Sequence, residues 1–333
     1  MAYPNTNIGD IVATTLENRS KKAADNVTRN NALLNRLTKR GTARPFSGGR
    51  EIWQEIEYAQ NSSIGWYSGY EVLNVSPTNI FTAATFPIRQ AAVAVSISGL
   101  EELQNSGPEQ MIDLIAGRVK NAEGTLSALI AQGLYSDGTT PKAIGGLQYL
   151  VSSTPASSVG GIDANTWAFW QNIAYGAITN GGAATTSANI RRYMDSVYVQ
   201  LVRGTDKPNL IVGDNTMWRL FNESLQPIQR IANAEMANAG FATISYMDNI
   251  PVVLDGGFQG NTGDPVPLGG APAGYMYMLN TSYIQYRPHS DRNFVPLNPD
   301  RYSINQDAVV KLMAWAGNMT ISNRRLQGVI YPS

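Results

Sequence analysis

The sequence predicts an α+β protein that carries one long exposed hairpin, and three patterns support this class. Residues 50–60 (REIWQEIEYAQ) and 89–99 (RQAAVAVSISG) alternate between two kinds of side chain, which is typical of β-strands. Residues 106–138 repeat apolar side chains at helical spacing, which predicts one long helix. Shorter strand-like and helical runs follow up to the C-terminus. We find no internal repeat.

The two alternating runs are expected to be the arms of one hairpin. In the first run, Ile52 and Ile56 face one side, whereas Glu51, Glu55 and Glu57 face the other. A strand with one apolar face packs that face on a core and leaves the other in water. The segment between the runs would then form the far end of the hairpin.

The far end of this hairpin contains large aromatic side chains in a polar segment. Trp66, Tyr67 and Tyr70 stand among Ser, Gly and Asn residues in NSSIGWYSGYEVLNV, residues 61–75. Aromatic side chains have a large apolar area, which is unfavourable to leave in water. We therefore expect them to contact a partner. The alternative is that they fold back on their own hairpin.

The N-terminal segment predicts a basic helix that depends on docking. Apolar residues between 8 and 38 form a thin stripe, and such a helix has little to stabilise it alone. Residues 1–46 carry eight basic and three acidic side chains, a net charge of 8 − 3 = +5. The basic residues expected to make contacts are Arg19, Lys21, Lys22, Arg29, Arg36, Lys39 and Arg40. The alternative is a solvated helix face.

The long helix has clear start and stop signals. Ser106 or Gly107 can cap it, and Pro108 suits a first turn because that position needs no N–H donor. The turn at 136–138 ends it. Its expected apolar stripe consists of Met111, Leu114, Ile115, Val119, Ala122, Leu126, Leu129, Ile130 and Gly133.

A composition break at 153–163 (STPASSVGGID) separates this helix from a second region of mixed structure. Expected helices are 165–178, 187–203 and 216–231, and expected strands are 209–214, the run IPVVLDGG and the run GYMYMLNTSYIQYR. Residues 255–274 form a Gly-rich loop, a length that is usually functional in a compact domain. Its candidate functional positions are Gly256, Gly257, Gly269 and Gly270.

The composition excludes several kinds of site. The 333 residues contain no cysteine, so disulfides and thiolate metal sites are impossible. With His289 as the single histidine, a three-histidine zinc site cannot form within one chain. The acidic residues are scattered, and no phosphate-binding loop, dinucleotide fingerprint or nucleophile elbow occurs. No metal or cofactor is expected.

His289 lies beside Ser290 and Asp291, which raises the alternative of a monomeric hydrolase. Catalytic partners normally converge from distant segments, so neighbours in sequence are poor candidates for a triad. We therefore expect the protein not to be an enzyme.

Charge and hydropathy describe the expected environment. Charged residues make up only 15% of the chain, below the roughly 25% of typical globular proteins, which suits a surface largely covered by copies of itself. The formal net charge is zero, so no global field draws the chain to nucleic acid or lipid. No window reaches about 18 consecutive apolar residues, and the N-terminus lacks a signal-peptide pattern. We expect a soluble product, made in the cytoplasm.

Three stretches in order resemble a known family. VATTLENRSKKAADNVTRNNALLNRL, the hairpin from GGREIWQ to SGLEELQN, and LYSDGTTPKAIGGLQYLV with Gly146-Leu147 are similar to parts of the major capsid proteins of tailed double-stranded DNA bacteriophages. These proteins have the Hong Kong 97-type fold. The resemblance implies an N-arm at 1–46, an E-loop at 47–99, a P-domain at 100–157 and 287–333 with its spine helix at 107–135, and an A-domain at 158–286.

The resemblance also implies a function and partners. Such a subunit forms pentamers and hexamers that build an icosahedral head shell, located in the virion, around packaged double-stranded DNA. Trp66, Tyr67 and Tyr70 would contact a neighbouring subunit, and the Gly-rich loop would lie at the symmetry axes. Portal, scaffolding and decoration or cement proteins are expected partners. Because the chain starts almost at the N-arm, we expect a separate scaffold or none.

Two further expectations follow from the resemblance. A cellular nanocompartment shell of the encapsulin type shares the fold and is the alternative function. Some relatives join an E-loop lysine to a neighbouring asparagine, and residues 47–99 contain no lysine. The basic residues there are Arg50 and Arg89, and a guanidinium stays protonated and is a poor nucleophile. We therefore expect shells without covalent cross-links.

Overall fold

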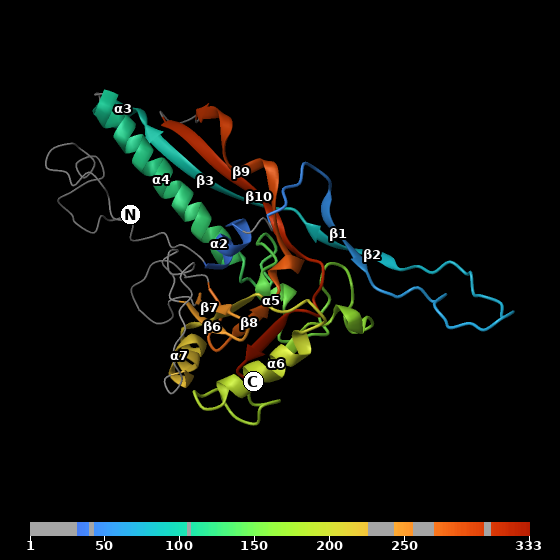
Figure 1. The fold of residues 1–333 in the computed structure, drawn as a ribbon. Coiled ribbons are helices and arrows are strands. Elements are labelled where there is room, and N and C mark those ends of the chain that lie inside the picture. The colour runs from blue at the N-terminus through green and yellow to red at the C-terminus, as the bar shows by residue number, and fades with distance from the viewer. Residues whose placement is uncertain (1–31, 40–42, 105–107, 226–242, 256–269, 303–307) are drawn as a thin grey trace.

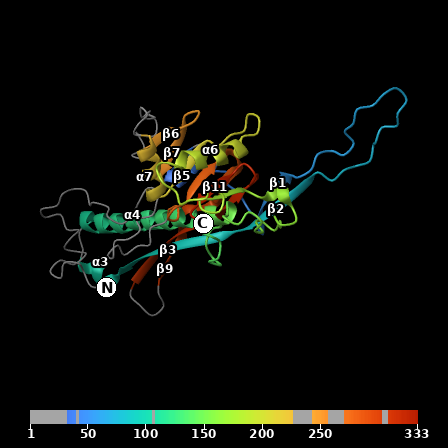
Figure 2. The same cartoon turned by 90° about the horizontal axis from the view of Figure 1, so that it is seen from below.

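Two β-sheets, a long helix and a projecting ribbon organise the chain (Figure 1). The computed structural model describes residues 32–39, 43–104, 108–225, 243–255, 270–302 and 308–333. Figures 1 and 2 both show the ribbon and its loop leaving the body on one side. The predicted α+β class is confirmed.

The first sheet has three antiparallel strands in the order β3-β10-β9. Their bounds are Arg89–Ser98 for β3, Ala308–Ile321 for β10 and Ile284–Tyr302 for β9. In β3, Val95 and Ile97 are buried while Ala94 and Ser96 are exposed, as the alternating pattern predicted. The helix α3 (Gly99–Gln104) follows β3 directly.

The long helix α4 (Pro108–Gly133) lies along β3 in both ribbon views (Figures 1 and 2). It begins at the predicted proline, which suits a first turn. Its side chains are described from residue 117 onward, and there Leu126 and Ile130 are almost fully buried. The prediction for Leu129 was wrong, since 52% of its surface is exposed. That position lies at the margin of the stripe, where the helix turns away from the core.

The second sheet has six strands in the order β4-β11-β8-β5-β7-β6. Its pairs are parallel for β4–β11 and β5–β7 and antiparallel for the others. The strands are β4 (Ile173–Gly176), β5 (Leu210–Gly213), β6 (Thr243–Tyr246), β7 (Ile250–Leu254), β8 (Met276–Leu279) and β11 (Gly328–Tyr331).

Apolar clusters cover both faces of this second sheet. On one face, Ile211 packs in the cluster of α6 (Ile190–Leu201) and α7 (Asn215–Ser224). On the other face, Leu210 and Val212 join the cluster of α4 and of the short helices α2 (Ala32–Lys39) and α5 (Leu147–Leu150). A strand that is buried on both faces has no polar side, which explains the continuous apolar runs in its sequence.

The junction after α4 explains the Gly146-Leu147 pair. Leu147 is fully buried and its N–H donates to the carbonyl oxygen of Leu134, 2.7 Å away. A Cβ atom on Gly146 would lie 2.6 Å from the Gly133 carbonyl oxygen and closer still to the Ser136 nitrogen. The backbone therefore passes through a space that only glycine fits. The predicted turn at 136–138 is present, because the Asp137 carboxylate accepts from the Thr139 N–H at 3.0 Å.

The prediction that residues 89–99 form the return arm of the hairpin was wrong. The partner of β1 (Glu51–Glu57) is β2 (Phe81–Pro87), whereas β3 pairs with β10 in the body. Proline has no N–H donor, so Pro87 closes the β1–β2 ladder. After Ile88 the chain enters the other sheet, where the apolar face of β3 meets a larger core.

The predicted helix at 165–178 was also wrong. This segment holds the short helix η1 (Ala168–Trp170) and the strand β4. The reason is tertiary, because the ladder partner of β4 is β11, which lies about 155 residues further along the chain. β6 was not predicted at all. η2 (Thr281–Tyr283) interrupts the run that was predicted as one strand segment.

The strand pairings join segments that the predicted division of the chain places in different domains. Residues 328–331 were grouped with the P-domain, and β11 lies inside the six-stranded sheet. Residues 89–98 were grouped with the E-loop, and β3 is an edge of the three-stranded sheet. These pairings join segments that are distant in sequence and do not by themselves define domains. The predicted domain boundaries stay predictions.

Candidate assembly surface

The root of the ribbon is fixed to the body by burial and by one buried amide. Ile52, Ile56 and Phe86 are almost fully buried on the inner face of the β1–β2 ribbon. The Asn318 side-chain N–H donates to the Pro87 carbonyl oxygen at 2.8 Å, and its Oδ1 accepts from the Gly145 N–H at 3.2 Å. Asn318 therefore ties the end of the ribbon to the junction after α4.

An aromatic cluster packs against the base of the loop. The Tyr58 ring lies 5.6 Å from the Trp167 ring and 6.0 Å from the Phe169 ring, measured between centroids. Trp170 is buried, packs on Phe169 and donates its indole N–H to the Val159 carbonyl oxygen at 2.9 Å. The Tyr58–Trp167 pair is edge-on, an arrangement that adds stability beyond the buried area. The cluster fixes the direction in which the loop departs.

Sequence reasoning missed this cluster, although the signal was available. Trp167, Phe169 and Trp170 stand close together in the polar stretch NTWAFWQN. That is the same pattern that singled out the segment 61–75. Gly160 was missed as well; its φ is +61°, and a Cβ there would lie 2.8 Å from the Ala84 Cβ.

The loop 58–80 is ordered at its base and at its tip. The Tyr58 N–H donates to the Ile80 carbonyl oxygen at 3.0 Å, and the Ser62 and Thr78 hydroxyls lie 2.7 Å apart. At the tip, the Glu71 carboxylate accepts from the Ser68 N–H at 3.0 Å and so closes a turn. Within that turn Gly69 has a φ of +56°, which favours glycine.

The predicted tip aromatics lie in solvent. Relative exposures are 104% for Trp66, 106% for Tyr70 and 66% for Tyr67, so these rings do not fold back on their own hairpin. Further exposed apolar side chains of the ribbon and loop are Trp53, Ile64, Val72, Leu73, Val75 and Phe81. Scattered single apolar residues are normal on a surface, whereas a contiguous set marks an interaction surface.

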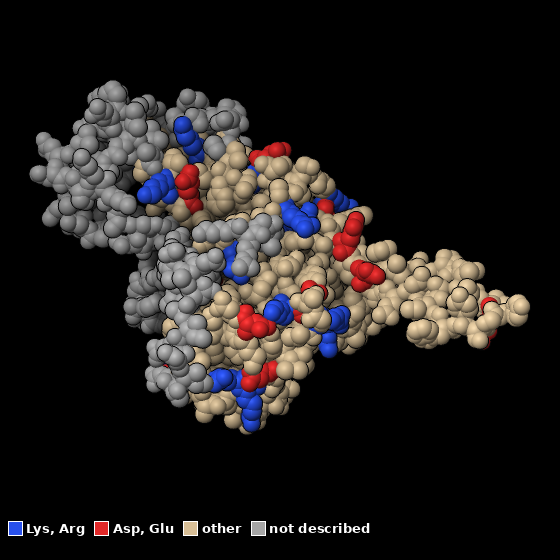
Figure 3. Space-filling model, in the orientation of Figure 1, with Lys and Arg blue, Asp and Glu red and all other residues tan. Residues whose placement is uncertain are grey.

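The same loop carries no positive charge. Between Arg50 and Arg89 the sequence has no lysine or arginine, and it has four glutamates. Figure 3 shows the projecting loop almost entirely without charged atoms, with acidic atoms near its end. The tip is therefore apolar and weakly acidic.

The described part of the N-terminal helix is docked on its own chain. Leu33 and Leu37 of α2 are fully buried, and the Leu33 N–H donates to the Asp255 carboxylate at 3.1 Å. Arg36 donates to the Asn209 carbonyl oxygen at 3.2 Å, so this basic side chain has a contact within its own subunit. The other predicted basic contacts lie outside the described residues: Arg19, Lys21, Lys22, Arg29, Arg40 and the side chain of Lys39.

The Gly-rich loop is described only at its two ends. Gly256, Gly257 and Gly269 lie outside the described residues, and Gly270 lies at the returning end. There the Ala271 N–H donates to the Asp255 carbonyl oxygen at 2.7 Å, which brings the two ends of the loop together. Its role at a symmetry axis stays a prediction.

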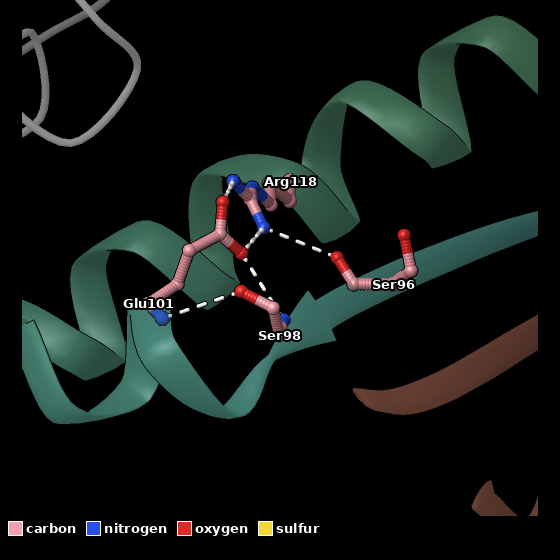
Figure 4. Close-up of polar contacts among 4 residues, drawn as sticks. All are labelled: Ser96, Ser98, Glu101 and Arg118. Carbon is pink, nitrogen blue, oxygen red and sulfur yellow. Dashed lines mark hydrogen bonds and ion pairs between the residues drawn. The ribbon is translucent and has the colours of Figure 1, made fainter. Parts of the chain in front are cut away.

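An ion pair joins α4 to α3 beside the end of β3, and sequence reasoning missed it (Figure 4). Arg118 of α4 makes two bonds to the Glu101 carboxylate, at 2.9 and 3.0 Å, and a third to the Ser96 carbonyl oxygen at 3.1 Å. The Ser98 N–H and the Glu101 carboxylate close a capping turn at 3.2 Å. The bond from Arg118, chiefly, lowers the pKa of Glu101 from its ordinary 4.5 to about 2.

His289, Ser290 and Asp291 are not arranged as the hydrolase alternative requires. The His289 Nδ1 atom accepts from the Asp291 N–H at 3.1 Å, and the Ser290 hydroxyl bonds to the Asp291 carboxylate at 3.1 Å. Among these three described residues, no hydrogen bond joins Ser290 to His289. The His289 ring instead meets the edge of Phe46 at 5.0 Å, where residues 46 and 289 form a bridge between segments.

The described residues form neither a metal-binding cluster nor a membrane-spanning helix. Within the described residues, no group of three or more acidic or histidine side chains is placed to hold a metal ion. No described helix is both long enough and apolar enough to cross a bilayer.

No family model and no curated protein matches this chain. Solved structures match it along almost its whole length. The capsid asymmetric unit of cyanophage A-1(L) has a TM-score of 0.64 at 17% identity and covers 95% of this chain and 96% of that chain. The chain has the Hong Kong 97-type capsid fold.

Other matches with the capsid fold come from different kinds of shell. The capsid of an empty GTA particle has a TM-score of 0.56 at 12% identity and covers 96% of this chain and 95% of that chain. An encapsulin complex from Synechococcus elongatus has a TM-score of 0.54 at 10% identity and covers 93% of this chain and 91% of that chain. The predicted capsid fold is confirmed, and identities this low show the fold alone.

Proposed function

We propose that the protein is the major subunit of an icosahedral viral head shell that encloses double-stranded DNA. The observation that carries this proposal is the capsid fold with an exposed apolar loop. A projecting two-stranded ribbon is marginally stable by itself, because it buries little area. Covering an exposed Trp or Tyr side chain contributes about 1.5–3 kcal/mol, so a neighbour that covers the tip is strongly favoured.

The shape of the subunit supports rings rather than closed pairs. The exposed tip lies at the far end of the projecting ribbon and loop, away from the body (Figures 1 and 2). If each tip contacts the body of the next copy, the interface is heterologous. Heterologous contacts form rings when the rotation between neighbours closes, and open filaments when it does not. Pentamers and hexamers are such rings. Trp66, Tyr67 and Tyr70 are the proposed anchors, because aromatic residues often dominate interface energies.

Several roles and partners belong to the same proposal. The basic residues of 1–46 other than Arg36 would contact a neighbour or the packaged DNA, and contacts of either kind weaken with salt. The Gly-rich loop with Gly256, Gly257, Gly269 and Gly270 would lie at the axes of the rings. Portal, scaffolding and decoration or cement proteins would join the shell in the virion. The protein would act as a structural component and not as an enzyme.

An encapsulin-type compartment is the second candidate. The solved encapsulin complex with the same fold favours it, and the fold does not separate the two functions. The contents of the particle separate the two functions. Nuclease-protected DNA inside purified particles would support the viral shell, and an enclosed enzyme would support the compartment.

Sedimentation and electron microscopy of the purified protein test the proposal. We expect capsomers or closed shells at high concentration, with any scaffold present. A sharp sedimentation boundary at the 36.1 kDa chain mass under those conditions would contradict it.

A further inference from the structure

We propose that the loop tip of one copy docks in one particular groove at the base of the ribbon of the next copy. This inference rests on the proposed shell function and adds the receiving site. The groove has a volume of about 570 Å³, which lies within the roughly 300–1,000 Å³ range of pockets that enclose small ligands. Its walls include Tyr58, Ala168, Phe169, Arg203 and Arg325.

The chemistry of this groove matches the tip. Tyr58 and Phe169 supply aromatic surface, and Arg203 and Arg325 are exposed guanidinium groups. Neither arginine has a carboxylate within ion-pair distance among the described residues. Glu57 also lines the groove, which leaves one net positive charge. The site therefore favours an aromatic segment with a negative charge.

A second groove, which shares Tyr58 and Phe169 with the first, is less suitable. Its volume is about 560 Å³, and its charged side chain is Asp163. The Asp163 carboxylate already accepts from the Asn165 N–H at 2.9 Å and from the Thr166 hydroxyl at 2.8 Å. An acidic wall repels an acidic tip, so charge selects the groove with the two arginines.

The tip has the complementary composition. Trp66 and Tyr70 are fully exposed, and Glu71 follows Tyr70 directly. The bond between the Glu71 carboxylate and the Ser68 N–H holds the turn in shape before docking. A turn that is ordered in advance loses less conformational entropy when it binds.

The tip and groove of one chain are kept apart. The bond between Tyr58 and Ile80 and the hydroxyl contact between Ser62 and Thr78 extend the loop away from its own base. Figures 1 and 2 both show that extended direction. Each copy thus presents a tip at one end and a groove at the other. The separation of tip and groove and their complementary charges identify a second copy of the chain as the occupant.

A disulfide trap tests the inference, because the chain contains no native cysteine. Ser68→Cys places a thiol in the tip turn, and Ala168→Cys places one in the groove; both changes are small and leave the aromatic and charged side chains intact. We expect the double variant, once oxidised, to form linked chains of up to six subunits on a non-reducing gel. The matched control pairs Ser68→Cys with Ala83→Cys, which lines the second groove, and should remain unlinked.

A further variant tests whether the negative charge of Glu71 contributes to docking. Glu71→Gln removes the negative charge and keeps an acceptor for the Ser68 N–H. When Glu71→Gln is added to the Ser68→Cys, Ala168→Cys double variant, disulfide formation should be slower by about two- to fivefold. This is the range expected for an exposed ion pair. Glu55→Gln, an exposed position on β1, should leave the rate unchanged.

The outcomes separate this inference from the proposed function. Particles that form normally while the Ser68–Ala168 pair stays unlinked would overturn the docking site and leave the shell function in place. Linkage through Ser68→Cys alone would mean that tips meet tips and would also overturn it. A protein that never assembles would contradict both.

Discussion

The six-stranded sheet and the projecting loop are stabilised in opposite ways within one chain. In the sheet, every side chain of β5 and β8 is buried, and each face is covered by helices of the same subunit. In the loop, Trp66 and Tyr70 are fully exposed. The sheet is therefore stable through its own burial, whereas the loop has apolar surface that only another molecule can cover.

This difference separates the part of the chain that drives folding from the part proposed to drive assembly. Burial of apolar side chains within the body drives folding of the monomer. The ribbon is fixed at its root by Ile52, Ile56, Phe86 and Asn318, so its direction is set before any partner arrives. A change in the body should alter subunit stability, and a change at the tip should alter assembly alone.

The largest expected effect is on the body. Gly146→Ala should destabilise the subunit by roughly 3 kcal/mol, because the new methyl group overlaps the backbone at Gly133 and Ser136. Denaturant unfolding of unassembled subunits measures the change. Gly65→Ala is the matched control in the loop, where a Cβ meets nothing within 4 Å and stability should stay the same. Equal stability of both variants would contradict the close packing at the junction.

The next effect is on the loop. Trp66→Ala and Tyr70→Ala should each weaken assembly by about 2 kcal/mol, the size expected for interface anchors. The concentration at which capsomers appear, measured by sedimentation, should rise accordingly. The unfolding free energy of the subunit should stay within about 0.5 kcal/mol of the wild type, as for other surface changes. Unchanged assembly would show that the tip is not an interface.

A smaller effect is expected where α4 meets β3. Glu101→Gln should cost about 1 kcal/mol of subunit stability, since it weakens the two bonds that Arg118 makes to a partly exposed carboxylate. In the wild type, the pKa of Glu101 is lowered from 4.5 to about 2. Its contribution is therefore complete above pH 4.5 and is lost as the pH falls toward 2.

Unfolding measured at several pH values tests this prediction. The stability difference between wild type and Glu101→Gln should shrink between pH 4.5 and 2. Glu55→Gln provides the control, because Glu55 is exposed and its removal should change little. A difference that is independent of pH would mean that the charge of Glu101 does not stabilise the pair.

The last prediction is that no covalent cross-link joins the subunits. Residues 47–99 contain no lysine, so the loop cannot supply the amine for an isopeptide bond to a neighbour. Particles boiled in detergent should run as one band near 36.1 kDa. A ladder of covalent oligomers would show that the loop is joined by chemistry rather than held by burial.

Local signals in the sequence predicted most of the elements. Pro108 marked the start of α4, the alternation in 50–60 predicted β1 with the correct face inward, and the apolar runs predicted β5, β7 and β8. The candidate tip was found because aromatic residues in a polar segment are conspicuous. Its exposure is a property of the structure, and its role as an interface remains a prediction.

Other features were beyond sequence reasoning because their partners are distant. The amide of Asn318 reaches Pro87, 231 positions away, and nothing local marks either residue. The segment 165–178 has a helical pattern, yet β11 draws part of it into a sheet. The groove beside Tyr58 combines residues from β1, η1 and several loops that are far apart in the sequence.

The sequence by itself determined the class of the protein, the apolar faces of its strands, its long helix and the composition of its loop. These depend on periodicity and on residue type, which are local. The tertiary structure decided which strand returns from the loop, where the C-terminal strand lies and what surrounds the base of the ribbon. Those depend on pairing between distant segments, because a short strand gains most of its stability from the neighbour that completes its hydrogen bonds and covers its side chains.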